Sequence, residues 1–304
     1  MKGYHIILLG LLFVCKSFFS PTFAQNPDKA LDPQLENTLL WEVKHPDYKK
    51  SSYLYGTIHI MPKKDFSLSE KILKRVKKSD RLVLEMKLDL MTSFVVMAGM
   101  QLERGKTLED FMTKQDYKEL SDYVADEMGS SMALFKSMKP FMLSQQVGMG
   151  GCIDMRSITS YETEFMALFD EDDRPISGLE TAKEQLSFID AIPMDKQIEG
   201  LMDAIRTDEQ EADEMCKELL QMIQVYKKEN LNELLAMTRS SEELGDQLAT
   251  FLDNRNEDWI AKIGTLMEDK ERLFIAVGAA HLPGEKGVIN LLRKAGYTVN
   301  PIME

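Results

Sequence analysis

Two segments of the chain repeat one local pattern around a histidine, and this repetition constrains the fold more than any other feature. Residues 51–62 read SSYLYGTIHIMP, and residues 277–284 read VGAAHLPG after the apolar run LFIA. Each segment has a β-rich run, then a glycine, a histidine three residues after that glycine, and a proline soon after. His59 and His281 are therefore expected to follow two strands in the same way.

The spacing suggests why a glycine precedes each histidine. Gly56 and Gly278 would each allow a tight turn and a close approach by another backbone at a strand end. In open α/β sheets, ligands bind in the crevice at the carboxyl ends of the strands. If the two strands are neighbours, His59 and His281 would project into one site. His45, which lies directly before a proline, lacks the pattern and is expected in a surface loop.

The order of strand-like and helix-like segments predicts the fold class. Short runs rich in β-branched and aromatic residues predict strands at 39–44, 53–58, 81–86, 174–180, 272–278 and 296–302. Amphipathic helices follow the two histidine strands and lead to the next strand in each case. We therefore expect an α/β fold with a central mixed sheet built from two βαβ units, which carry the paired G-x-x-H motifs. A long helical insertion is expected between about residues 90 and 270.

The N-terminal segment has the composition of a secretory signal peptide. Lys2 leads into an apolar stretch that is shorter than the roughly 20 residues needed to span a bilayer, and small residues end at Ala24. No later segment is apolar enough to span a membrane. We expect cleavage before Gln25 and a single exported domain over residues 25–304, located in the periplasm or outside the cell.

Charge and cysteine content limit the partners of the mature chain. The full chain has a formal net charge of −13 at pH 7, and the first 24 residues carry two lysines and no acidic residue. The mature protein is therefore more acidic still, which argues against nucleic acids and anionic membranes as partners. A peptide or small-molecule substrate is expected. Cys152 and Cys216 lie in the exported part, where a disulfide is chemically possible, although spacing alone does not show that they meet.

Two glutamates are candidates to join the histidines. Glu85 lies near the end of the apolar strand RLVLEM, where a carboxylate is seldom buried without a partner. Glu180 ends its own strand, although it could instead help to begin the next helix. Two histidines and two glutamates could hold a divalent metal or perform acid–base chemistry. Exchange of Glu85 for Gln is expected to cost activity with little loss of stability. Arg255 and Asn256, in FLDNRNEDW, read by themselves as a solvated helix face.

In order and spacing, the segments YGTIHIMP, RLVLEM, SGLETAKEQL, NRNEDW and AVGAAHLPGEKGVINLLRKAGYTV resemble the TraB/GumN superfamily, from about residue 38 to the end. The resemblance is strongest to its bacterial GumN-like branch. The superfamily includes the animal Tiki proteins, which look like metal-dependent peptidases, and it is related in fold to erythromycin esterase-like enzymes and haem-binding ChaN proteins. The resemblance implies an α/β core in which paired histidines and a glutamate form the site. Its motif residues here are His59, Glu85, Glu180, Arg255, Asn256 and His281, with Gly56 and Gly278.

Together these features lead us to expect an exported hydrolase, and specifically a metal-dependent peptidase. His59 and His281, with Glu85 or Glu180, would bind a divalent ion such as Zn, Mn, Co or Fe. The remaining glutamate would act as general base, and Arg255 would stabilise an oxyanion. Two alternatives remain open. One is a metal-free ester or amide hydrolase with a histidine base, and the other is a non-catalytic envelope protein that binds haem, metal or a polymer.

Overall fold

The computed structural model describes residues 34–150, 152–239, 245–268 and 271–304. The expected signal peptide over residues 1–24 lies outside these ranges. The described chain forms two compact units. We call them the sheet unit, made of residues 34–87, 159–179 and 221–304, and the helical unit, made of residues 88–158 and 180–220.

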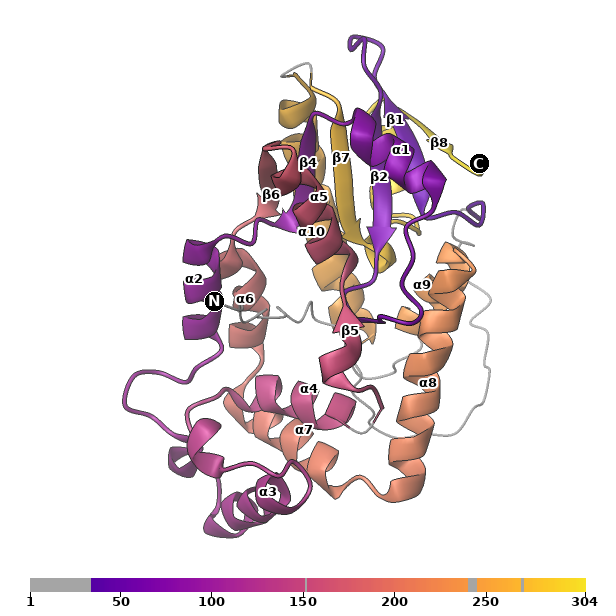
Figure 1. Ribbon diagram of the computed structural model, residues 1–304. Coiled ribbons are helices and arrows are strands. Elements are labelled where there is room, and N and C mark those ends of the chain that lie inside the picture. The colour runs from indigo at the N-terminus through magenta and orange to yellow at the C-terminus, as the bar shows by residue number, and fades with distance from the viewer. Residues whose placement is uncertain (1–33, 151, 240–244, 269–270) are drawn as a thin grey trace. The chain divides into compact units, whose positions relative to one another are not determined.

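A six-stranded mixed sheet, in the order β6-β4-β7-β2-β1-β8, forms the centre of the sheet unit. Its strands are β1 (Leu40–Lys44), β2 (Ser52–Thr57), β4 (Arg81–Met86), β6 (Ile176–Glu180), β7 (Leu273–Gly278) and β8 (Thr298–Pro301). Strand β7 lies between β4 and β2 and is parallel to both, whereas β1 is antiparallel to β2 and to β8 (Figure 1). The two histidine strands are therefore neighbours.

Two helices complete the βαβ units. Helix α1 (Glu70–Lys78) connects β2 to β4, and α11 (Val288–Lys294) connects β7 to β8. Since both connected strands run in the same direction in each case, the expected α/β fold with a mixed sheet and two βαβ units is confirmed.

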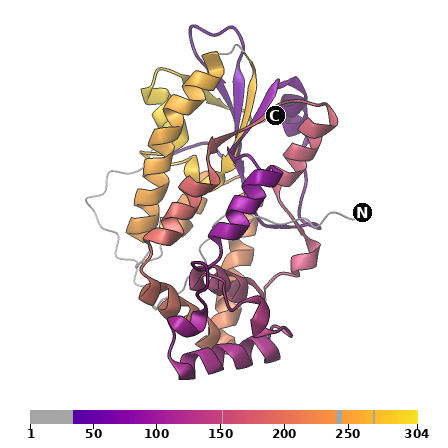
Figure 2. The ribbon, with the colours of Figure 1, turned by 90° about the vertical axis from the view of Figure 1, so that its left-hand side faces the viewer.

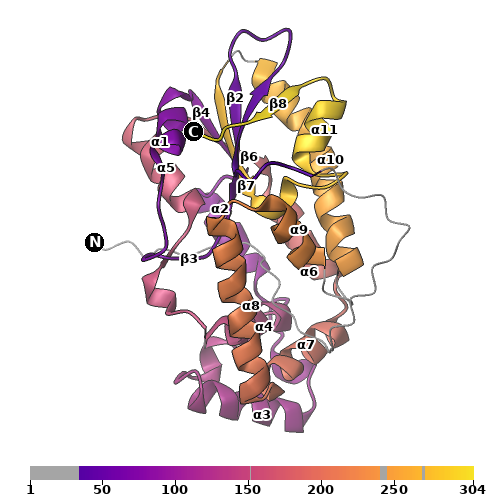
Figure 3. The ribbon, with the colours of Figure 1, turned by 90° about the vertical axis from the view of Figure 1, so that its right-hand side faces the viewer.

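Helices cover both faces of this sheet. Figures 2 and 3 show α1 and α5 (Tyr161–Glu171) on one face, and α10 (Gly245–Glu268) and α11 on the other. All six residues of β2 and all six of β7 are buried. Near-continuous burial is typical of parallel strands that are covered on both faces, and it explains why β7 reads as a continuous apolar run rather than an alternating one. The remaining elements of this unit include β3 (Met61–Pro62), η4 (Ala279–His281) and α9 (Leu231–Arg239).

The helical unit has a core of its own. Its α-helices are α2 (Leu90–Gly99), α3 (Lys114–Asp126), α4 (Pro140–Gly150), α6 (Ala182–Ala191) and α7 (Met194–Arg206). Short 3-10 helices join them, namely η1 (Leu108–Asp110), η2 (Met132–Leu134) and η3 (Met155–Ser157), and β5 (Ile158–Thr159) follows. The core consists of the apolar residues Leu102, Leu108, Leu120, Val124, Leu143, Val147 and Leu201.

The expected helical insertion does not lie in the helical unit alone. Residues 159–179 return to the sheet unit, where β6 forms the edge of the sheet beside β4, and residues 221–268 belong to that unit as well. Helix α8 (Glu209–Lys227) runs from one unit into the other. Among the helices that the structure describes, none is both long and apolar enough to cross a bilayer.

Cys152 and Cys216, which the sequence left undecided, are joined by a disulfide within the helical unit. Their Cα atoms are 5.0 Å apart, and 64 positions separate them in the sequence. Closing a loop of this length restricts the unfolded chain, which in the chain-entropy model stabilises the fold by roughly 4 kcal/mol.

Exchanging both cysteines for serine is therefore expected to lower the free energy of unfolding by roughly 2–4 kcal/mol. The measurement is urea unfolding of the mature protein and of the Cys152→Ser/Cys216→Ser variant, with the thiol content of the unfolded wild type as a check on the bond. Equal unfolding midpoints for the two proteins would contradict this expectation.

Candidate functional site

The two G-x-x-H motifs leave the sheet at the same level. In the register of β2 and β7, Gly56 pairs with Val277 and Thr57 pairs with Gly278. A Cβ atom on Gly56 would lie 3.1 Å from the backbone of Ala279, and one on Gly278 would lie 3.2 Å from a carboxylate oxygen of Glu85. The close approach that the sequence suggested for the two glycines is therefore present in the structure.

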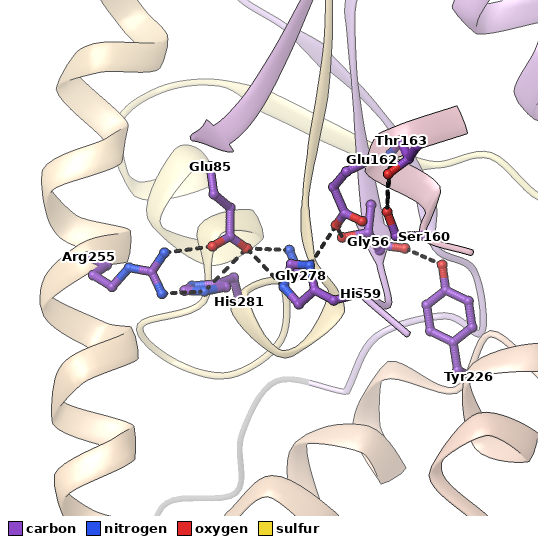
Figure 4. A network of polar contacts seen from close by, with 11 residues as sticks. Gly56, His59, Glu85, Ser160, Glu162, Thr163, Tyr226, Arg255, Gly278 and His281 are labelled. Atoms are coloured by element: carbon purple, nitrogen blue, oxygen red, sulfur yellow. Dashed lines mark hydrogen bonds and ion pairs between the residues drawn. The ribbon is translucent and has the colours of Figure 1, made fainter. Parts of the chain in front are cut away.

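Glu85, the penultimate residue of β4, lies between the two histidines (Figure 4). Its Oε1 is 3.9 Å from His59 Nε2 and 3.7 Å from His281 Nε2. The backbone N–H of Gly278 donates to the same oxygen at 2.7 Å, and Arg255 Nη2 donates to Oε2 at 2.6 Å. Burial alone would raise the pKa of Glu85, but the Arg255 guanidinium, the charge on His59 and the Gly278 N–H hold it far below its usual range. Glu85 is thus a buried anion in the middle of the site.

The ring of His281 is held in one orientation. Its Nδ1 lies 2.6 Å from Asn256 Oδ1, and the Asn256 amide group donates to the carbonyl oxygens of His281 and Lys286 at 3.3 and 2.9 Å. Since the amide oxygen can only accept, Nδ1 carries the hydrogen and Nε2 keeps a lone pair. Trp259 packs against the ring at 4.4 Å between centroids. Burial lowers the pKa of His281 to about 3 despite the nearby Glu85, so the ring is neutral.

His59 has a different partner. Its Nδ1 lies 2.9 Å from Oε1 of Glu162, and Thr57 Oγ1 donates to that same oxygen at 2.5 Å (Figure 4). Burial alone would lower the pKa of His59, but the carboxylates of Glu162 and Glu85 raise it to about 9. The two histidines therefore differ in charge at neutral pH, although their sequence motifs are alike.

Arg255 links the carboxylate to the second histidine. Its Nη1 lies 3.3 Å from His281 Nε2 while its Nη2 binds Glu85, and its guanidinium also lies 5.0 Å from the ring of Trp259. Helix α10 supplies Arg255, Asn256 and Trp259 together. The R-N pair, which reads by itself as a solvated helix face, thus points at the site and contacts it directly.

A buried tyrosine supports the end of the first histidine strand. Tyr226 of α8 donates its hydroxyl hydrogen to the carbonyl oxygen of Gly56 at 2.9 Å, and its oxygen lies 3.2 Å from that of Tyr55. Because the contact is made to a backbone atom beside the motif, it fixes where the chain turns toward His59.

The structure brings together five of the six candidate side chains, namely His59, Glu85, Arg255, Asn256 and His281. Glu180 ends β6 and is counted with the helical unit, so its catalytic role stays a prediction. His45 lies outside the site, with its ring against Tyr48 and Tyr297.

Sequence reasoning missed Glu162. It lies in the first turn of α5, behind the N-cap Ser160, where acidic residues are common because they suit the positive end of a helix. An acidic residue at this helix position needs no further explanation, so the contact between Glu162 and His59 could not be inferred from it. No spacing in the sequence links the two residues either. Trp259 and Tyr226 were missed for a similar reason, because apolar and aromatic residues at helical spacing usually mark the core.

The site has residue types that suit a divalent ion, but its donor atoms are not at the spacing that an ion requires. No three His, Cys, Asp or Glu side chains in the described ranges have ready-formed metal spacing. Donors that share an ion at about 2.0–2.2 Å lie roughly 3.3 Å apart. The distances from Glu85 Oε1 to the two Nε2 atoms, 3.9 Å for His59 and 3.7 Å for His281, are a few tenths of an ångström longer. Both imidazoles nevertheless have outer acceptors on Nδ1, as metal-binding histidines do. The residue types are those of a metal site, but Arg255 would have to release His281 Nε2 before that nitrogen could bind an ion.

The opposite pKa shifts of the histidines predict how the stability of the metal-free protein depends on pH. The pKa of His59 is raised from 6.5 to about 9, so its contribution is complete below pH 6.5 and is lost as pH rises through 9. The pKa of His281 is lowered to about 3, so its contribution is present above pH 6.5 and is lost as pH falls toward 3. Stability is therefore expected to peak near pH 6–7 and to fall by about 3 kcal/mol toward pH 9.5. Urea unfolding in the presence of a chelator measures this curve, and His59→Gln should flatten its alkaline side while His45→Gln should not.

The fold and the site together define a class of α/β protein. In this class, two neighbouring parallel strands each end in a G-x-x-H motif, and both histidines lie beside one buried glutamate. The chain belongs to the TraB/PrgY/gumN family, whose sequence pattern matches residues 39–301. It is similar to the protein described as "Uncharacterized protein YbaP" in Shigella flexneri, at 24% identity over 80% of this chain and 88% of the relative. The protein of the same description in Escherichia coli strain K12 is 24% identical over 79% of this chain and 87% of the relative. No solved structure matches the chain.

Proposed function

We propose that this protein is an exported, metal-dependent hydrolase of the peptidase type. The observation that carries the proposal is that His59 and His281, from two neighbouring strands, both turn Nε2 toward one oxygen of Glu85. Two imidazole nitrogens and a carboxylate oxygen are a donor set that suits Zn, Mn, Co or Fe. These three residues would hold the ion, which when bound lowers the pKa of a water molecule and makes it a nucleophile at neutral pH.

Arg255 is the proposed oxyanion partner. In the structure its guanidinium is shared between Glu85 and His281, and its side chain is only 13% exposed. If Arg255 Nη1 leaves His281, the guanidinium remains attached to Glu85 through Nη2. The N–H groups that are then free can donate to a negative charge that develops on a substrate. The proposed peptide substrate rests on the likeness to the animal peptidases, and an ester substrate would use the same groups.

A metal-free hydrolase is the second candidate, and one observation favours it. Arg255 already supplies positive charge to both Glu85 and His281, which is the task that a metal would perform. In that case the neutral His281 would take a proton from the attacking water, and His59, which is charged and paired with Glu162, would donate one to the leaving group.

Metal content and chelation together test the proposal. We would purify the mature protein, His59→Ala and His45→Ala from the same host, and measure transition metals, visible absorption and hydrolysis of an unstructured peptide library with and without chelator. The proposal expects one metal per chain in the wild type and His45→Ala, none in His59→Ala, and no hydrolysis after chelation. Hydrolysis that survives removal of all metal would favour the metal-free candidate. A Soret band without hydrolysis would favour a haem-binding protein.

Export is part of the proposal and has its own measurement. The intact mass of the protein from the envelope fraction of its native host is expected to correspond to a chain that begins at Gln25. A cytoplasmic protein that keeps Met1 would contradict it.

A further inference from the structure

We propose that Glu162 is a positioning residue for the site, and that it acts by fixing the ring of His59 so that Nε2 faces Glu85. The proposal rests on the proposed function in one respect, namely that His59 is a working residue of the site. It holds for the metal-dependent and for the metal-free candidate alike, because each needs a lone pair or a proton at Nε2 rather than at Nδ1.

The contact geometry is the first support. Glu162 Oε1 lies 2.9 Å from His59 Nδ1, and the side chain of Glu162 is only 12% exposed. The same oxygen accepts from Thr57, which lies between the glycine and the histidine of the first motif. Two residues of the motif, Thr57 and His59, therefore contact one carboxylate oxygen supplied by α5, and an ionised carboxylate can only accept hydrogen bonds. An acceptor at Nδ1 leaves Nε2 as the ring nitrogen that faces Glu85.

The second support is the energetic cost of the arrangement. Burying a carboxylate costs several kcal/mol unless it is paired. The other oxygen, Glu162 Oε2, is buried and has no hydrogen-bond partner among the described residues. A residue kept only for packing would be less costly as a neutral or apolar side chain of the same size. The charge at position 162 is therefore best explained by what it does to His59.

The comparison with the second histidine explains why a carboxylate is needed here. At His281 a neutral amide is sufficient to present an acceptor to Nδ1, because the NH₂ group of Asn256 donates to the carbonyl oxygens of His281 and Lys286. That anchoring forces the amide oxygen toward the ring. At position 162 the contacts from His59 Nδ1 and Thr57 Oγ1 are both made to Oε1, and Oε2 has no hydrogen-bond partner in the described part of the chain, so neither contact would anchor the NH₂ of an amide there. An amide could therefore rotate and present its NH₂ to His59. Only a carboxylate presents an acceptor in both orientations.

Glu162→Gln is the variant that separates this role from a structural one, and Glu164→Gln is its matched control. Glu164 lies in the same first turn of α5 and is bound by Thr159 Oγ1 at 2.7 Å, so its exchange removes the same charge from the same helix end. We would measure kcat, KM, Mn²⁺ affinity and melting temperature for both variants. Glu162→Gln is expected to lower kcat and Mn²⁺ affinity by about 10–100-fold with KM near that of the wild type. Its melting temperature is expected to fall as well, because His59 loses its closest counter-charge. Glu164→Gln is expected to stay within about twofold of the wild type in kcat, KM and Mn²⁺ affinity, with a melting temperature near that of the wild type.

A spectroscopic measurement keeps this test independent of the proposed function. In ¹⁵N-histidine-labelled, metal-free protein, His59 is expected to show a hydrogen-bonded Nδ1–H signal that persists in Glu164→Gln and weakens or disappears in Glu162→Gln. If the wild type neither binds metal nor hydrolyses peptides, the proposed function fails while this signal still tests Glu162. The positioning role is overturned if the His59 signal is the same in Glu162→Gln as in Glu164→Gln.

Discussion

His59→Ala and His281→Ala are each expected to abolish the same activity, with a fall in kcat/KM of about 10³-fold or more. The reason is geometric, because both Nε2 atoms face one oxygen of Glu85 and each would bind or activate the same group. Steady-state kinetics and metal content of the purified variants measure the effect, and circular dichroism checks that the fold is retained.

The double variant sharpens this prediction. Ligands of one centre act as a unit, so His59→Ala/His281→Ala should be no worse than either single variant. His45→Ala is the control, since His45 contacts Tyr48 and Tyr297 rather than the site. The shared site is wrong if both single variants lose several degrees of melting temperature yet keep their activity and ligand content.

Glu85→Gln is expected to abolish activity and also to destabilise the protein by roughly 3 kcal/mol. The sequence alone suggested little loss of stability, and the structure changes that expectation. Glu85 is paired with Arg255, whose side chain is nearly buried, so a neutral residue at position 85 leaves a buried cation without its counter-charge. Urea unfolding at pH 7 gives the magnitude.

A second exchange tests the cause of that instability. Glu85→Gln/Arg255→Met removes the stranded charge while keeping similar volume, so it should recover much of the lost stability and none of the activity. If Glu85→Gln alone is as stable as the wild type, the ion pair contributes little and Glu85 is held mainly by the Gly278 N–H.

The fold was predictable where local pattern and burial agree. β2 and β7 are buried throughout because both faces of the sheet are covered, and each is followed by a helix with one apolar side, so both βαβ units could be read from sequence. The position of β7 between β2 and β4 could not, because strand order depends on how distant segments pack.

The site was predictable only in part, for a related reason. His59 and His281 stand out because histidine is rare in this chain and the motif is repeated. Glu162 and Trp259 carry no such signal, since each suits an ordinary helix position and gains its role from a segment far away in the sequence. The role of Arg255 could not be read from the sequence, because a charged residue on a helix usually faces solvent. In the structure its side chain binds a buried carboxylate.

The central place of β7 determines when this protein can first become folded during synthesis. Because β7 lies between β2 and β4 but is translated some two hundred residues after them, a nascent chain that ends before Leu273 leaves the inner edges of both strands unpaired. Such a chain lacks His281 and has no completed sheet, so the paired-histidine site and a closed fold arrive together, late in translation. If the protein is exported as we propose, this order is useful, because a polypeptide that stays open until β7 emerges remains in the extended form that a translocation channel accepts.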